Sequence, residues 1–201
     1  MFKTIFHTRN TIFFPAQKWG NSQIRSVGKT SLLRQYVTGT HGLDYRATIG
    51  ADFLAKDVIV AERLVTLQIW DTAGQERFKS LSRIYYNGTD CCVLVFDITN
   101  RRSFRDLLGW RDEFVREARV LDPLNFPFVV VGNKSDLEES GLRAVSNRDA
   151  VQWCAANGSN YFETSVWDDS NVDQAFQNAA IKAVVRVRQR ELQIPRYPRP
   201  A

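Results

Sequence analysis

The sequence predicts a three-layer α/β fold in one domain, with a mostly parallel central sheet covered by helices on both faces. From Ser26 onward, apolar runs alternate with amphipathic segments, which is the order that builds parallel sheets. Most of the apolar runs are continuous, as in strands that are buried on both faces. A chain of 201 residues with 44% hydrophobic residues is long enough to bury such a core.

The expected strands and helices follow one another along the chain. The strands are expected at Asp52–Val60, Leu64–Trp70, Cys91–Asp97, Pro127–Val131 and Asn160–Thr164. The helices are expected at Gly28–Thr38, Ser103–Ala118, Asn147–Asn157 and Val172–Arg190. Ser103 and Asn147 are the predicted N-caps of the second and third helices. In the last helix, apolar residues at three- and four-residue steps are expected to face the core: Val172, Phe176, Ala179, Ala183 and Val187.

A motif at the end of the second expected strand points to a magnesium and phosphate site. The run Trp70-Asp71-Thr72-Ala73-Gly74-Gln75 places a carboxylate where a strand ends. Asp71 can reach a magnesium ion on a triphosphate, usually through water. Gly74 lets the backbone approach a γ-phosphate, and Gln75 can orient an attacking water.

A second motif follows the strand at Pro127–Val131 and points to a guanine base. In the run Asn133-Lys134-Ser135-Asp136, the carboxylate of Asp136 can accept from guanine N1–H and N2–H, while the stem of Lys134 packs on the base. Either motif alone occurs by chance on protein surfaces. Both together, in this order and spacing, indicate a site for GTP.

The phosphate loop that should complete this site is only partly present. Such a loop follows the pattern G-x-x-x-x-G-K-[ST], in which glycines allow the turn and backbone N–H groups surround the β-phosphate. Gly28, Lys29 and Thr30 fit its end, with Lys29 on the β- and γ-phosphates and Thr30 on magnesium. The first glycine position is Gln23, and a second position where glycine is usual is Ser26.

The segment before the loop also departs from expectation, because Pro15–Ser22 stands where an apolar strand belongs. We therefore expect the first strand to be replaced or missing. Residues 1–25 are assigned as an atypical N-terminal segment, 26–190 as the nucleotide-binding domain and 191–201 as a Pro/Arg tail. The abrupt break at Ser26 indicates a replaced first exon, an alternative transcript or a misplaced start. The alternative is a targeting peptide, since Met1–Leu43 is rich in Thr, Ser and basic residues and has no acidic residue.

From Ser26 to Arg186 the chain resembles Rab-type small GTPases. The further segments that carry the resemblance are Ile49-Gly50-Ala51-Asp52-Phe53, the run from Leu64 to Phe78 and Tyr85-Tyr86-Asn87-Gly88. The alanine of the first segment and the run Asp90–Asp97 look most like the late-endosomal and vacuolar branch. The resemblance implies the fold of the P-loop NTPases, hydrolysis of GTP to GDP and phosphate, and Mg²⁺ as the cofactor. Its implied partners are Rab effectors, exchange factors and GTPase-activating proteins.

The resemblance also assigns roles to residues. Gln75 is the catalytic residue. The phosphate contacts are Ser26, Val27, Gly28, Lys29, Thr30, Thr48 and Gly74. The guanine contacts are Asn133, Lys134, Asp136, Ser165, Val166 and Trp167, the last of which replaces the usual lysine. The metal ligands are Thr30, Thr48 and Asp71. The effector contacts are Ile49, Phe53, Trp70 and Tyr85.

Charge and cysteine content bear on location. The net charge of +5 comes largely from the two ends, which are either solvated tails or weak attractors of anionic membranes or nucleic acid. No aromatic or glycine-rich pattern supports nucleic acid as a partner. The three cysteines, without zinc spacing, indicate a reducing compartment and no disulfide. No cysteine follows Cys154, so no stable lipid anchor is evident. We expect a cytoplasmic protein, peripheral on late endosomal or vacuolar membranes.

Three functions remain open from the sequence. The first is a GTP-binding switch that regulates vesicle traffic and hydrolyses GTP slowly, with Thr48 and Gly74 released from the γ-phosphate on hydrolysis. The second is a binding module with impaired nucleotide binding, which presents Phe53, Trp70 and Tyr85 to partners without cycling. The third is the product of an incorrect gene model that barely folds.

Overall fold

The computed structural model describes residues 10–14, 27–40, 51–72, 86 and 88–193. In these ranges the strands are β1 (Asn10–Phe14), β2 (Ala51–Val60), β3 (Arg63–Thr72), β4 (Cys91–Asp97), β5 (Phe128–Asn133) and β6 (Asn160–Thr164). The helices are α1 (Lys29–Thr38), α3 (Arg101–Arg105), α4 (Leu107–Glu117), the short 3₁₀ helix η2 (Ser135–Leu137), α5 (Asn147–Ala156) and α6 (Val172–Gln193).

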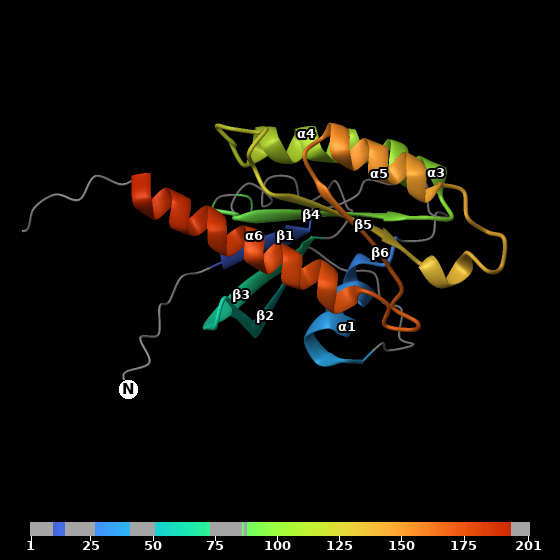
Figure 1. The fold of residues 1–201 in the computed structure, drawn as a ribbon, viewed down its shortest axis with the longest axis horizontal. Helices are drawn as coiled ribbons and strands as arrows, with labels where there is room; N and C mark the ends of the chain where they lie inside the picture. The colour runs from blue at the N-terminus through green and yellow to red at the C-terminus, as the bar shows by residue number, and fades with distance from the viewer. Residues whose placement is uncertain (1–9, 15–26, 41–50, 73–85, 87, 194–201) are drawn as a thin grey trace, which may run out of the picture.

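The strands form one six-stranded sheet with the order β2-β3-β1-β4-β5-β6. Only β2 runs antiparallel to its neighbour, β3, so the predicted α/β class and mostly parallel sheet are confirmed. Helices α1 and α6 cover one face, and α3, α4 and α5 cover the other (Figure 1). Each face has its own apolar cluster, with Cys91 in one and Cys92 in the other, as strand alternation requires. Both cysteines and Cys154 are free thiols.

A first strand is present, so of the two expected alternatives, a replaced or a missing first strand, the missing strand is wrong. The first strand is β1, which lies upstream of Pro15 and pairs in parallel with both β3 and β4. Its Thr11-Ile12-Phe13-Phe14 run is rich in β-branched and aromatic residues, which favour extended backbone. Ile12 is 0% exposed and belongs to the apolar cluster that contains Cys91, which is called the main core below. The sheet therefore has a central strand ahead of the phosphate loop.

Both predicted N-caps are wrong, the first by three residues and the second by one. The segment expected as one helix from Ser103 forms α3 and α4, and the cap of α3 is Asn100, whose Oδ1 accepts from the backbone N–H of Arg102 at 3.0 Å. Ser103 is buried instead, and its hydroxyl donates to the Asn100 carbonyl at 2.7 Å. The cap of α5 is Ser146, one residue before the predicted Asn147, and it accepts from an N–H at 3.0 Å. Several neighbouring polar residues could each cap these helices, so the sequence alone does not determine which of them is the N-cap.

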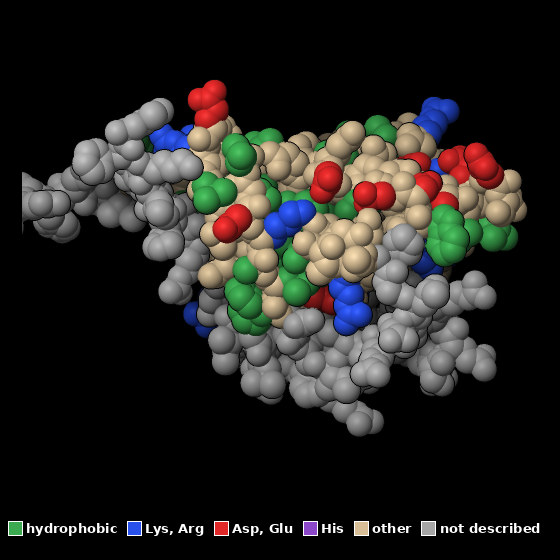
Figure 2. Space-filling model, turned by 90° about the horizontal axis from the view of Figure 1, so that it is seen from below, with side chains coloured by type: hydrophobic (Ala, Val, Ile, Leu, Met, Phe, Trp, Pro, Cys, Tyr) green, Lys and Arg blue, Asp and Glu red, His purple; other side chains and the backbone are tan. Residues whose placement is uncertain are grey.

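The apolar stripe of α6 faces the core as predicted. Val172, Phe176, Ala179 and Ala183 are all buried against the sheet. On the part of the face in Figure 2 that is not drawn in grey, hydrophobic, acidic and basic side chains are interspersed, and several acidic side chains lie together at one end. Among the described residues, none of the helices combines the length and the apolar character needed to cross a bilayer.

Candidate functional site

Three predicted phosphate and metal residues meet where α1 begins. In the β1–β3 ladder, Phe14 lies opposite Asp71, so the C-terminal ends of both strands reach the same edge of the sheet. Thr30 Oγ1 donates a hydrogen bond to Asp71 Oδ2, and Asp71 is buried. Burial lowers the pKa of Lys29, and the charge of Asp71 opposes that shift. A lysine, a hydroxyl and a carboxylate thus gather at a helix N-terminus, where backbone N–H groups favour an anion.

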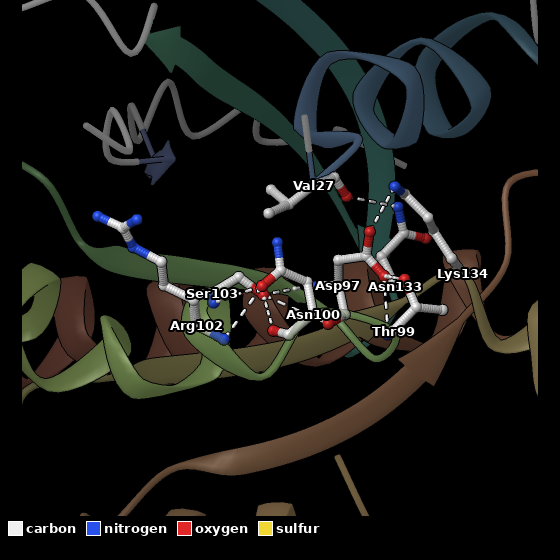
Figure 3. Close-up of polar contacts among 8 residues, drawn as sticks. All are labelled: Val27, Asp97, Thr99, Asn100, Arg102, Ser103, Asn133 and Lys134. Atoms are coloured by element: carbon white, nitrogen blue, oxygen red, sulfur yellow. Dashed lines mark hydrogen bonds and ion pairs between the residues drawn. The ribbon is translucent and has the colours of Figure 1, made fainter. Parts of the chain in front are cut away.

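The end of the predicted phosphate loop is joined by a hydrogen bond to the predicted base-binding motif. Asn133 Nδ2 donates to the carbonyl of Val27 at 2.9 Å, and both residues are buried (Figure 3). Gly28 follows with a φ of +86°, and a Cβ there would lie 2.5 Å from Asn133 Nδ2. The predicted phosphate and guanine motifs, about a hundred residues apart in sequence, are therefore in direct contact.

The base-binding motif is held by residues from three neighbouring segments. Asn133 Oδ1 accepts from Thr164 Oγ1 at 3.1 Å, which ties the end of β5 to the end of β6. Lys134 has a φ of +70° and pairs through its Nζ with Asp97 Oδ2 (Figure 3). Asp136 Oδ1 accepts from Ser165 Oγ at 2.6 Å. Polar groups that could meet a purine base thus converge at the carboxyl ends of β4, β5 and β6, where ligands of parallel sheets bind.

The predicted guanine loop after β6 turns tightly around Ser165. Its hydroxyl accepts from the backbone N–H of Trp167 at 3.0 Å, and its own N–H donates to the carbonyl of Ser170 at 3.2 Å. Val166 is half-buried against the main core. The side chain of Trp167 is 71% exposed, so the replacement of the usual lysine leaves the packing of the core unchanged.

Sequence reasoning missed two groups that position this site. Asp97 is buried at the end of β4. Its Oδ1 accepts from the Thr99 N–H at 2.9 Å and from Thr99 Oγ1 at 2.6 Å, and its Oδ2 accepts from Lys134 Nζ. Arg143 forms a two-bond pair with Glu163 at 3.0 and 2.7 Å, just before the loop at Ser165. The signal for Asp97 was available, since a carboxylate that ends a buried parallel strand reaches the ligand edge of the sheet.

The donors at the start of α1 fit a magnesium ion that arrives with a phosphate ligand. Thr30 Oγ1 and Asp71 are hard oxygen donors already within contact of each other. The described part of the chain has no group of three His, Cys, Asp or Glu side chains that could hold a metal by itself. Magnesium commonly uses one or two protein ligands together with phosphates and waters, so the pair suits such an ion.

Several predicted residues lie outside the described ranges, and their roles stay predictions: Ser26, Thr48, Ile49, Gly74, Gln75 and Tyr85. Of the remaining effector candidates, Phe53 is 43% exposed on β2 and Trp70 is half-buried on β3. Their rings lie 4.9 Å apart and are tilted by 54°. The pair forms an aromatic surface on the two-stranded edge of the sheet.

Comparison with known proteins supports the chemistry suggested by this geometry. The sequence pattern of the Ras family matches residues 23–185. The chain is 51% identical over 167 residues to the Ras-related protein RABG3a of Arabidopsis thaliana, covering 83% of this chain and 81% of that protein. It is 53% identical over 170 residues to the Ras-related protein Rab7 of Pisum sativum, covering 84% and 82%. It is 54% identical over 161 residues to the Ypt/Rab-type GTPase Rab7 of Gibberella zeae, covering 80% and 78%.

Proposed function

Because the chain belongs to the Ras family of small GTPases and resembles its Rab7 members, we propose that it is a GTP-binding switch that hydrolyses GTP to GDP and phosphate. The observation that supports this most directly is the hydrogen bond from Asn133 Nδ2 to the Val27 carbonyl. It holds the proposed phosphate-binding start of α1 against the proposed base-binding motif, so that one nucleotide would meet both.

The phosphate end of this site acts through charge and backbone donors. Lys29 brings a cation to the β- and γ-phosphates, and the N-terminus of α1 adds its backbone N–H groups. When bound, Mg²⁺ neutralises charge on the β- and γ-phosphate oxygens. Thr30 and Asp71 would hold that ion, and their existing hydrogen bond keeps both oxygens close together.

The base end of the site selects guanine. Asp136 presents a carboxylate that Ser165 fixes at 2.6 Å, and two donors on guanine, N1–H and N2–H, match its oxygens. Adenine lacks this pair of donors. Lys134 is held by Asp97, so its stem is positioned to lie on the plane of the base. The backbone N–H of Val166 is the candidate donor to guanine O6.

Hydrolysis needs residues of the two switch segments. In this proposal Gln75 orients the attacking water, and Thr48 and Gly74 respond to the γ-phosphate. Loss of that phosphate releases both segments, which is the order–disorder mechanism of GTPase switches. Hydrolysis by the chain alone is slow, and a GTPase-activating protein accelerates it. Effectors then recognise the GTP state through the aromatic surface of Phe53 and Trp70, in traffic at late endosomal or vacuolar membranes.

A second candidate function is a Rab-like binding module that does not cycle. The observation that favours it is the phosphate loop, in which Gln23 and Ser26 stand at glycine positions and residues 15–22 separate β1 from the loop motif. A hydrogen bond to a charged group contributes roughly 1.5–3 kcal/mol, so losing about two such contacts would weaken binding by roughly two to four decades.

The experiment that tests the proposal is a displacement titration with a fluorescent guanine nucleotide. The full chain in Mg²⁺ should bind mant-GDP saturably, and GDP should displace the probe whereas ADP should not. The variant Asp136→Asn should shift preference toward xanthosine diphosphate, because an amide donor suits the C2 oxygen of the xanthine base. As a control, Asp168→Asn, on the exposed side of the same loop, should keep guanine preference. A chain that melts cooperatively but binds no guanine nucleotide would support the binding module instead.

A further inference from the structure

A cavity of about 390 Å³ lies at the end of the molecule opposite the nucleotide site. Its walls come from three parts of the chain: the C-terminal half of α6, the residues Tyr86, Gly88 and Thr89 before β4, and residues 118–122, 125 and 126 between α4 and β5. Figure 1 shows the C-terminal part of α6 and the connection from α4 to β5 at the same end of the sheet, where β4 begins. The cavity is therefore separate from the groups that would bind GTP.

Arginine side chains dominate the charge of this cavity. Arg119, Arg186 and Arg190 all line it, against one lining carboxylate, Asp122. Asp122 is already engaged, because its oxygens accept from Asn125 Nδ2 at 2.7 Å and from Asn125 N–H at 3.3 Å. The lining thus carries an excess of positive charge.

Among the residues that the structure describes, a close carboxylate neutralises one of the three arginines. Arg190 pairs with Asp90, which is fully buried behind the cavity and also accepts from the Thr11 N–H at 3.1 Å. Asp90 therefore serves the contact between α6 and β1. Within the described ranges, neither Arg119 nor Arg186 makes an ion pair closer than 4.0 Å.

The guanidinium of Arg186 is positioned by an aromatic ring, and one of its N–H donors has no hydrogen-bond acceptor among the described residues. Its guanidinium lies 4.5 Å from the centre of the Phe126 ring, a cation–π contact that orients the fork. Its Nε–H is buried and has no acceptor in the part of the chain that the structure describes. Burial lowers the pKa of Arg186, and the neighbouring charge of Arg190 lowers it further. A buried N–H donor beside a like charge is the arrangement that a bound oxyanion would stabilise.

We infer that this cavity binds a phosphate monoester, with the guanidinium group of Arg186 donating to the phosphate oxygens. Arg119 and Arg190 supply further charge. The planar guanidinium fork matches two oxygens of a phosphate group, which a lysine would not. The volume of about 390 Å³ lies in the lower range of small-molecule sites, so the phosphate is expected to be carried on a sugar-sized group.

Such a group could be a soluble sugar phosphate or the headgroup of a phosphoinositide, since both present the same chemistry. Leu121, which lines the cavity, is 99% exposed, and Leu192 on the last turn of α6 is also exposed. Apolar side chains beside a cationic cavity would suit a lipid surface. The two sources are distinguished by experiment.

The test is a residue-resolved NMR titration of the full chain with inositol monophosphate. Binding in the cavity should shift the amide signals of Gly88 and Gln189 saturably. Arg186→Gln and Arg119→Gln should each weaken binding about tenfold or more, because each removes a charged donor. Arg188→Gln is the matched control, since it removes the same charge from an exposed position of the same helix that does not line the cavity. It should leave the affinity unchanged.

The proposal is overturned if no saturable shift occurs, if all three variants weaken binding equally, or if the shifts gather around Gly28 and Lys29. The last result would mean that the probe occupies the nucleotide site. Because Arg119 is exposed, its variant is expected to fold even if Arg186→Gln does not.

Sedimentation with phosphatidylcholine vesicles that contain or lack phosphatidylinositol monophosphate then separates the two sources. Pelleting that needs both the phosphoinositide and Arg186 supports the proposal with a lipid ligand. Binding of soluble inositol monophosphate without vesicle binding supports it with a soluble ligand.

Discussion

At the scale of single residues, the position of Gly28 is constrained both by backbone conformation and by space. Its φ of +86° is a region that side chains with a Cβ rarely adopt, and the room beside it is taken by Asn133 Nδ2, 2.5 Å from where a Cβ would lie. Asn133 is in turn fixed by Val27 and Thr164. A single methyl group at this point would therefore disturb both ends of the nucleotide site.

We predict that Gly28→Ala lowers the affinity for guanine nucleotide by tenfold or more. The substitution should also cost about 1–3 kcal/mol of stability, because it adds a positive-φ penalty to the loss of a buried hydrogen bond. Gly39→Ala is the matched control, since Gly39 also has a positive φ, +67°, but no atom of the described residues lies within 4 Å of its Cβ position. It should show the backbone penalty alone, with nucleotide affinity unchanged in the mant-GDP titration. Equal losses in the two variants would refute the contact argument.

Asp90 should make the stability of the protein depend on pH. Burial raises the pKa of its carboxyl to about 6, against the lowering effects of the Thr11 N–H and of Arg190 and Arg186. Between pH 3.8 and about 6, the folded state therefore keeps a proton on Asp90 that the unfolded state, with an ordinary pKa of 3.8, has already released. The contribution of Asp90 to the free energy of unfolding is therefore fully present below pH about 4. It is lost as the pH rises through about 6, a change of about 3 kcal/mol.

The variant Asp90→Asn cannot ionise, so its stability relative to the natural protein should rise by about that amount between pH 4 and pH 7. Urea denaturation across this range measures the difference, with Asp112→Asn on the exposed side of α4 as the control for the substitution itself. A difference between Asp90→Asn and the natural protein that does not change with pH would contradict the raised pKa.

At the scale of elements, β1 decides whether the sheet is complete. It lies between β3 and β4 and pairs with both, so its loss would divide the sheet in two. The strand had a sequence signal, a short β-branched and aromatic run ended by proline. The strand is hard to assign from sequence because residues 15–22 separate it from the phosphate loop, which a strand of this kind usually precedes directly.

We predict that Ile12→Ala destabilises the protein by about 2–5 kcal/mol, the usual cost of deleting a buried isoleucine side chain. Ile59→Ala removes the same atoms from a strand position that is 66% exposed, and it should cost far less. Chemical denaturation of the two variants measures both values. If Ile12→Ala were as mild as Ile59→Ala, β1 would not be a core strand in solution.

The sequence predicted the α/β class, most elements and the motif residues of the site, but not how these residues are held. Apolar runs and motif spacing are local, so they locate strands and the ends of strands where ligand groups gather. The partners of those groups are not local: Val27 and Asn133 meet across more than a hundred positions, and Lys134 meets Asp97 from a neighbouring strand. Such pairs depend on strand order, which a single sequence does not supply.

At the scale of the whole molecule, the sheet separates two functional ends. The carboxyl ends of β1, β3, β4, β5 and β6 carry the groups proposed to bind GTP, whereas the opposite end carries the arginine-lined cavity. Helix α6 runs the length of the sheet between them (Figure 1). A ligand at the cavity could therefore hold the protein at a surface without competing with nucleotide.

The central claim, that the chain cycles between GTP and GDP, is tested most directly by single-turnover hydrolysis. The full chain is loaded with GTP, and the bound nucleotide is separated and quantified over time in Mg²⁺. We predict slow conversion of bound GTP to GDP, and slower conversion by Gln75→Leu with equal initial loading. A chain that retains no GTP, or that forms GDP at the same rate with and without Gln75, would contradict it.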